Sequence, residues 1–189
     1  MLMKSIKRKY VTANELKNSK FIIFGEMHTS EDRDEVEFLI RRAHTLKPFK
    51  VLFSEECGSE VFLTPNAIKR GLELEKWSIS DRSFKLALEL GLQVVGCDLW
   101  DKSVYAWDKK DENGIYTDCR RSFALREQFM IDQIMGLCNP NNPHVRGCMI
   151  VGDSHLRMTK NPVMGDASAL GKLVYNRGLI LRSDIGEVT

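Results

Sequence analysis

The sequence has no hydrophobic run long enough to cross a membrane and no excess of either charge. A spanning helix needs about 20 apolar residues, and residues 1–4 contain no apolar stretch typical of a secretion signal. The formal net charge is +2, and charges of both signs are spread along the chain. This pattern gives no indication of a nucleic-acid or membrane partner. We therefore expect a cytoplasmic protein without such partners.

The sequence also lacks the usual motifs for covalent and phosphate chemistry. Its five cysteines are widely spaced and form no Cys-x-x-Cys pair, which is typical of reduced thiols. Cys97 and Cys148 lie in apolar runs, so they are predicted to be core residues. There is no phosphate-binding loop. No Gly-x-Ser-x-Gly elbow is present either, so Ser154 beside His155 is a poor candidate for a serine hydrolase.

What the chain does contain is an alternation of short apolar runs and helical patterns. Strands are predicted at 21–24, 51–54, 93–97, 148–151 and 178–181. Helices are predicted at 12–18, from Ser30 as N-cap to Pro48, from Pro65, at 81–90, at 118–137 and at 167–175. Such alternation predicts an α/β fold with a mostly parallel sheet of about five strands and helices on both faces.

The predicted domain organisation is simple. A chain of 189 residues is one domain of ordinary size, so 1–189 is expected to form a single α/β domain. Residues 1–19 are expected to form an N-terminal tail and a short helix. Residues 101–118 are polar and contain Asn113-Gly114, which indicates a surface loop.

The most informative feature is a short motif that occurs twice. Gly25-Glu26-Met27-His28 follows the apolar run 21–24, and Gly152-Asp153-Ser154-His155 follows the apolar run 148–151. Because ligands bind at the carboxyl ends of parallel strands, the two copies are expected to bring acids and imidazoles to one edge. The alternative is that each glycine only opens a tight turn, with the histidine capping or filling space.

Acidic residues follow the other predicted strands as well. Glu55 and Glu56 follow the second strand, and Asp98 follows the third. Any one of these acids could simply cap the next helix, but as a set they favour a site. The sequence does not choose between Glu55 and Glu56, because a register change of one residue exchanges the side on which each points.

Arg126 is the candidate cation for this site. It lies at helical spacing from Phe123 and Met130, which places it on the apolar stripe of its helix. An arginine buried there needs an anionic partner, and the acids at the strand ends could supply one. The alternative is that its stem packs while its head reaches water.

These motifs carry a resemblance to a known superfamily. In chain order they are Gly25-Glu26-Met27-His28, Glu55 or Glu56, Arg126-Glu127-Gln128-Phe129-Met130 and Gly152-Asp153-Ser154-His155. Together they resemble the superfamily that includes the erythromycin esterases, the ChaN-like haem-uptake proteins, the TraB and GumN proteins and the Tiki metalloproteases. The resemblance covers about 21–181, and the segments 95–99 and 164–178 look like the esterase branch. The chain is much shorter than the esterases and lacks their helical additions.

The resemblance implies a hydrolase that works without a covalent intermediate. In this hypothesis His28 or His155 takes a proton from water while Glu26 orients the imidazole. Arg126 would stabilise the developing oxyanion. The predicted catalytic set is Glu26, His28, Glu55, Arg126 and His155, with Asp98 and Asp153 as predicted substrate-binding residues. The expected substrate is a small molecule or a peptide.

Two alternatives accompany this hypothesis. In a metal version, His28, His155 and one or two of Glu26, Glu55 and Glu56 bind a divalent zinc, manganese or cobalt ion, which activates water. In a non-catalytic version, the same residues hold a ligand or a protein segment, as the ChaN-like branch implies.

Overall fold

The computed structural model describes residues 12–73, 82–138, 141–157, 159–172 and 179–182. Its central sheet contains five parallel strands, which are β1 (Phe21–Glu26), β2 (Val51–Gly58), β4 (Gln93–Asp98), β7 (Gly147–Gly152) and β8 (Leu179–Arg182). A short strand β3 (Phe62–Leu63) pairs antiparallel with β4, so the sheet order is β3-β4-β2-β7-β1-β8. The prediction of a mostly parallel sheet of about five strands is confirmed, with the short β3 as a sixth strand.

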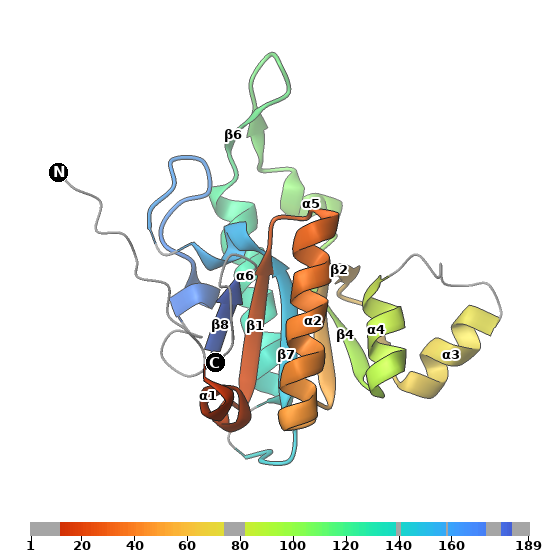
Figure 1. Cartoon of the computed structure of the whole chain (residues 1–189). Coiled ribbons are helices and arrows are strands. Elements are labelled where there is room, and N and C mark those ends of the chain that lie inside the picture. Colours follow the sequence, from red (N-terminus) through yellow and green to blue (C-terminus); the bar gives the residue numbers. More distant parts are fainter. Residues whose placement is uncertain (1–11, 74–81, 139–140, 158, 173–178, 183–189) are drawn as a thin grey trace.

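Helices cover both faces of this sheet, as the sequence predicts (Figure 1). The helices are α1 (Ala13–Asn18), α2 (Ser30–Leu46), α3 (Pro65–Glu73), α4 (Arg82–Leu90), α5 (Lys102–Tyr105) and α6 (Arg120–Leu137). Helices α2, α3 and α4 pack on one face, and α6 packs on the other. A single 3-10 turn, η1 (Asp153–Leu156), follows β7 directly.

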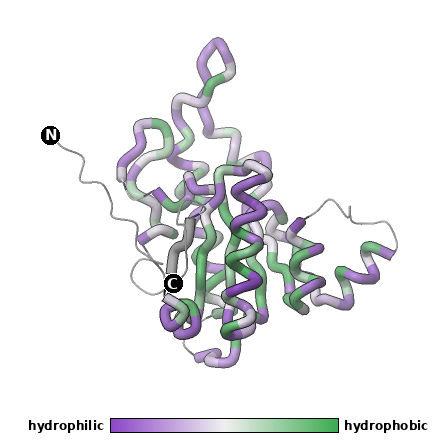
Figure 2. Tube along the Cα trace, in the orientation of Figure 1, coloured by the Kyte–Doolittle hydropathy of each residue, from purple (hydrophilic) through white to green (hydrophobic). Residues whose placement is uncertain are grey.

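The continuous apolar runs reflect burial on two sides. In β1, Ile22 and Phe24 pack toward α2 and α4, whereas Phe21 and Ile23 pack toward α6. A strand covered on both faces has no solvent side on which to place polar residues. Figure 2 accordingly shows hydrophobic strands enclosed by helices that are hydrophilic on their outer sides.

Several local predictions need correction. The N-cap of α2 is Thr29 rather than Ser30, because the Thr29 hydroxyl accepts the Asp32 N–H. Strand β2 continues through Glu55 and Glu56 to Gly58 rather than ending at residue 54. The predicted loop 101–118 contains α5 and a two-stranded hairpin, β5 (Lys109–Lys110) and β6 (Tyr116–Asp118), which projects away from the sheet (Figure 1).

Other local predictions are confirmed. Thr12 forms a capping box with Glu15 at the start of α1, and α4 ends before Gly91, which has a positive φ of 66°. Of the helix predicted at 167–175, residues 169–172 are helical, and 173–175 lie outside the described residues. None of the helices in the described ranges is both long and apolar enough to cross a bilayer.

Candidate functional site at the carboxyl ends of the strands

Four parallel strands end at one edge of the sheet, and their registers align the residues that matter. Glu26 at the end of β1 lies opposite Gly152 at the end of β7. Gly58 at the end of β2 lies opposite Asp98 at the end of β4. The segments that follow β1 and β7 carry His28 and His155. The chain topology therefore gathers the predicted residues at this edge, as expected for an α/β sheet.

Glu55 lies at the centre of this edge. One carboxylate oxygen accepts a hydrogen bond from Arg126 Nη2 at 3.0 Å, and the other accepts from the Gly152 N–H at 2.5 Å. His155 Nε2 lies 3.3 Å from Glu55 Oε1. Burial alone would raise the pKa of Glu55, but His155, the Gly152 N–H and Arg126 together lower it to about 2. Glu55 is therefore ionised at neutral pH.

Arg126 is largely buried, and its Nε and Nη2 are paired with two acids. Its Nε and Nη2 each donate to one oxygen of Asp98 at 2.6 Å, in the fork geometry that favours arginine over lysine. Burial lowers the pKa of Arg126, but Asp98 and Glu55 raise it by more. Arg126 therefore joins the two acids Asp98 and Glu55, and Asp98 is itself buried rather than facing solvent.

His155 is an interior side chain. It is 1% exposed and stacks on Phe123, with ring centroids 4.7 Å apart. Its Nε2 faces Glu55, and its Nδ1 lies 3.7 Å from Glu127 Oε1. Burial lowers the pKa of His155, but Glu127 and Glu55 raise it by more. The ring therefore lies buried between two carboxylates, which favour its protonated form.

Glu127 completes the surroundings of His155. It accepts hydrogen bonds from Arg157 Nη1 at 2.7 Å and from the Ala169 N–H at 3.1 Å. Burial would raise the pKa of Glu127, but His155 and Arg157 lower it. The sequence reasoning missed this residue, although Glu127 precedes Met130 by three positions and Ile134 by seven, which places it on the buried side of α6.

His28 has the opposite environment. Its side chain is 59% exposed, and its backbone has a φ of +59°, which is uncommon for a residue other than glycine. Its Nδ1 lies 3.3 Å from Glu26 Oε1. Strained backbone of this kind tends to persist where the surrounding structure enforces it, often at functional sites.

Gly152 joins the two copies of the motif. A β-carbon at this position would lie 2.5 Å from His28 Nε2 and 3.3 Å from Glu55 Oε2. Only glycine therefore leaves room for the His28 ring beside the end of β7. Through Gly152 and Glu55, the exposed imidazole of the first copy and the buried imidazole of the second belong to one connected site.

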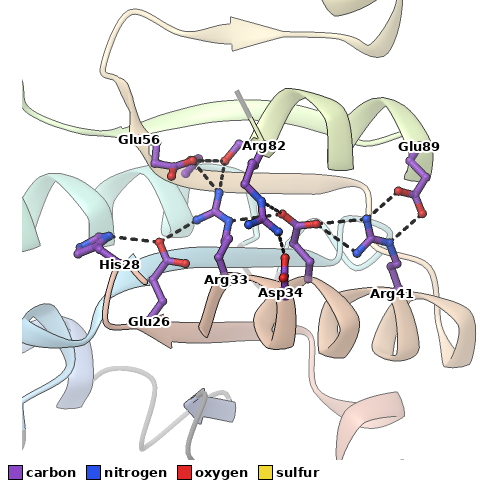
Figure 3. Close-up of polar contacts among 11 residues, drawn as sticks. Glu26, His28, Arg33, Asp34, Arg41, Glu56, Arg82 and Glu89 are labelled. Carbon is purple, nitrogen blue, oxygen red and sulfur yellow. Dashed lines mark hydrogen bonds and ion pairs between the residues drawn. The ribbon is translucent and has the colours of Figure 1, made fainter. Parts of the chain in front are cut away.

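Glu26 and Glu56 lie on the α2 side of the sheet, and a buried arginine links them (Figure 3). Arg33 Nη1 donates to Glu26 Oε1 at 2.8 Å, and Arg33 Nη2 donates to Glu56 Oε2 at 2.6 Å. The adjacent residues Glu55 and Glu56 thus point to opposite faces of β2. Glu55 contacts His155 and Arg126, whereas Glu56 contacts Arg33 and Ser83.

The structure therefore joins most, but not all, of the predicted site residues. Glu26, His28, Glu55, Arg126, His155 and Asp98 form one connected set. Glu56 joins it only through Arg33, and Asp153 lies half-buried at the start of η1. Arg33 was missed, although it precedes Val36 by three positions and Ile40 by seven on the buried stripe of α2. The chemical roles assigned to these residues stay predictions.

A metal ion does not fit these residues as they lie. Within the described part of the chain, no group of three or more His, Cys, Asp or Glu side chains is arranged to hold one. Glu26 and Glu55 are instead paired with Arg33 and Arg126. The prediction of zinc, manganese or cobalt stays untested, and we derive no chemical step through a metal.

The solved structures with a similar fold are those of bacterial toxins. No protein-family model matches the sequence, and no curated protein matches it. RRSP, a MARTX toxin effector domain from Vibrio vulnificus CMCP6, matches with a TM-score of 0.54 and 17% identity over 90% of this chain and 34% of that chain. A structure described as bacterial protein toxins matches with a TM-score of 0.55 and 15% identity over 92% and 36%.

A third solved structure is that of Pasteurella multocida toxin, whose C-terminal region is described as having a thiol-protease like catalytic triad. It matches with a TM-score of 0.51 and 10% identity, over 79% of this chain and 21% of that chain. At such identities the likeness shows the fold alone. This chain also spans only about a third of the length of the toxin structures, or less.

The expected membership of the erythromycin esterase, ChaN-like and Tiki superfamily is wrong. The similar solved structures are toxin effector domains, and no family model supports the resemblance. The functions predicted from that membership are therefore wrong as well. They are a hydrolase of erythromycin esterase or Tiki type and its ChaN-like alternative. The physical reason is that each motif is short. A glycine at a strand end and a polar residue beyond it suit many parallel sheets, so they identify the edge rather than the family.

Proposed function

We propose that this chain is the catalytic core of a toxin-effector-like enzyme that hydrolyses an amide bond of a protein, with His28 as the general base. The observation that carries the proposal is the setting of His28. Its imidazole is exposed, its Nδ1 lies 3.3 Å from the buried Glu26 carboxylate, and its Nε2 lies beside Gly152. An exposed imidazole backed by a carboxylate is suited to taking a proton from water.

The proposed reaction runs through one bound water. Glu26 accepts a hydrogen bond from Nδ1–H of His28, so the proton stays on Nδ1 and the lone pair of Nε2 is free to deprotonate water. The water oxygen bonds to the substrate carbonyl carbon, and the carbon–nitrogen bond then breaks. The proton that His28 took from water passes to the leaving nitrogen, so atoms and charge balance.

The other groups support this reaction rather than share in it. Arg126 binds Glu55 and Asp98 through its Nε and Nη2, so we assign it to fixing Glu55 rather than to the oxyanion. His155 is too buried to meet a substrate, and we assign it to the same supporting network.

A thiol nucleophile is not part of the proposal. All five cysteines are reduced and buried. Cys97 is the one close to the site, and burial together with Glu55 and Asp98 raises its pKa well above the usual value. The thiol-protease like triad of the Pasteurella toxin therefore has no counterpart that we would assign here. The reduced thiols support a reducing compartment such as the cytoplasm as the place of action.

A polypeptide is the substrate class that we favour. The similar structures belong to toxin effector domains, and one of those toxins is described as protease-like. Two large apolar side chains are also exposed close in sequence to the site. Met27, between Glu26 and His28, is 65% exposed, and Trp100, two residues after Asp98, is 53% exposed. No nucleic-acid or membrane partner is proposed.

The test is cleavage of a complex peptide mixture. The protein is incubated with a proteome-derived peptide library, and new termini are identified by mass spectrometry. We expect defined cleavage sites that decrease at least about 100-fold in His28→Ala, as for loss of a general base. His144→Ala is the matched control, because His144 is exposed but precedes β7 at the opposite end of the sheet. Unchanged cleavage by His28→Ala, or no cleavage by the wild-type protein, would overturn the proposal.

A further inference from the structure

Arg33 is a buried cation that the proposed reaction does not use directly. It is 4% exposed on the inner side of α2, where unpaired charge is costly. Burial lowers the pKa of Arg33, but Glu26 and Glu56 raise it by more, so the guanidinium stays charged. A buried arginine beside the proposed base requires an explanation beyond stability, since ion pairs of this kind contribute little net stabilisation.

The guanidinium is fixed from three directions. Its Nη1 donates to Glu26 on β1, while its Nη2 donates to Glu56 on β2 and to Ser83 on α4, the last at 2.9 Å (Figure 3). Ser83 in turn lies 2.8 Å from Glu56 and 2.9 Å from the hydroxyl of Ser54. Arg33 therefore has one orientation, set by two strands and a helix.

This orientation determines where Glu26 points. Oxygen Oε1 of Glu26 accepts from Arg33 and also faces His28 Nδ1. The second oxygen, Oε2, is buried and has no hydrogen-bond partner among the residues that the structure describes. In the described structure, Arg33 is thus the one donor whose hydrogen bond keeps the Glu26 carboxylate turned toward His28.

We infer that Arg33 is a positioning residue that keeps the Glu26 carboxylate aimed at His28 Nδ1, and so fixes the tautomer of the imidazole. This inference rests on the proposed function of His28. Arg33 contacts no reacting atom and acts only through Glu26. The planar fork of arginine serves Glu26 and Glu56 at once, whereas a lysine ammonium is a point charge that cannot reproduce both contacts.

The experiment compares Arg33→Met and Arg33→Lys with a matched control, Arg82→Met. Arg82 belongs to the same polar network, but it binds Glu37 and Asp34 and does not contact Glu26 (Figure 3). With a peptide that the wild-type protein cleaves, we expect Arg33→Met to lower kcat about 10- to 100-fold with little change in KM. Arg33→Lys should recover part of the loss, and Arg82→Met should retain the wild-type kcat.

A further measurement separates positioning from a loss of folding. The tautomer of His28, read from long-range proton–nitrogen NMR spectra, should be the Nδ1–H form in the wild-type protein and Arg82→Met. It should become a mixture in Arg33→Lys, which keeps the buried positive charge.

The outcomes distinguish this inference from the proposed function. If His28→Ala retains activity, the proposed function itself is wrong. If His28→Ala is inactive but Arg33→Lys keeps the wild-type kcat and tautomer, the positioning role of Arg33 is wrong while the function stands. The tautomer measurement needs no substrate, so it decides the role of Arg33 even where Arg33→Met fails to fold.

Discussion

The two copies of the glycine–acid–x–histidine motif end in imidazoles with opposite surroundings. In the first copy, the His28 side chain is largely exposed and its backbone is left-handed. In the second copy, His155 lies in the 3-10 turn η1 and is buried between Glu55 and Glu127. The same four-residue pattern therefore produces one imidazole that can meet water and one that cannot.

The two copies also differ in the face of the sheet from which an arginine holds their carboxylate. On the α2 face, Arg33 holds Glu26 behind the exposed His28. On the α6 face, Arg126 holds Glu55 beside the buried His155. Each imidazole thus has a carboxylate that is fixed by an arginine. Exposure, rather than the identity of the partners, separates the proposed base His28 from the supporting imidazole of His155.

The largest expected effect separates the adjacent acids Glu55 and Glu56. Glu55→Ala removes a buried partner of Arg126 and leaves the Gly152 N–H without its acceptor, so we expect a loss of about 3 kcal/mol in the free energy of unfolding. Glu56 is 42% exposed at its side chain, and Glu56→Ala should cost about 1 kcal/mol or less, as for a screened pair. Urea unfolding at pH 7 measures both.

The pH dependence of the free energy of unfolding is the control for the comparison of Glu55 with Glu56. The folded pKa of Glu55 is about 2, below the usual value of 4.5, so its contribution is present above about pH 4.5 and is lost as the pH falls toward 2. The difference between the wild-type protein and Glu55→Ala should shrink over that range. Equal losses in both variants at pH 7 would contradict the assignment of the two acids to different faces.

Much of the fold could be predicted from the sequence because it rests on local signals. The apolar runs in β1 and β7 are buried on both faces, and Gly91 ends α4 with a positive φ. The edge strand β3 was missed because two residues carry no periodic pattern. The sequence could not decide between Glu55 and Glu56 either. Strand β2 continues past its apolar run, and its register there depends on the neighbouring strands.

The candidate site was predictable in position but not in its connections. Glu26, His28 and His155 could be placed from strand ends alone, since parallel strands share an edge. The partners of Arg33 come from β1, β2 and α4, and no local pattern encodes such long-range contacts. The resemblance to erythromycin esterases was wrong for a related reason. Motifs this short indicate residues at the carboxyl edge of a sheet, but they do not identify a family.

The next effect concerns the buried imidazole. The folded pKa of His155 is raised by Glu127 and Glu55, so its stabilising contribution is complete below the unfolded pKa of about 6.5 and is lost as the pH rises through the folded value. We expect the free energy of unfolding to fall on this alkaline side in the wild-type protein and to change less in His155→Gln. The loss should be smaller than in Glu55→Ala, because both carboxylates keep their arginines.

The measurement is urea unfolding between pH 5 and pH 9, with His144→Ala as the exposed-histidine control. That variant should follow the wild-type curve, because His144 lies in an exposed loop away from the site. Parallel curves for the wild-type protein and His155→Gln would show that folding does not raise the pKa of His155, and the contrast between the two copies would then be one of exposure alone.

The smallest expected effect tests the backbone of the first copy. His28 has a φ of +59°, which costs most side chains about 1 kcal/mol and costs glycine nearly nothing. His28→Gly should therefore be more stable than His28→Ala by about 1 kcal/mol, although both lack the proposed base. Thermal and urea unfolding compare the two variants directly. The same pair at His155, where η1 has ordinary helical backbone, should show the opposite order, because glycine there adds only chain entropy to the unfolded state. If the Gly and Ala variants had the same order of stability at both positions, backbone strain would not distinguish the first copy from the second.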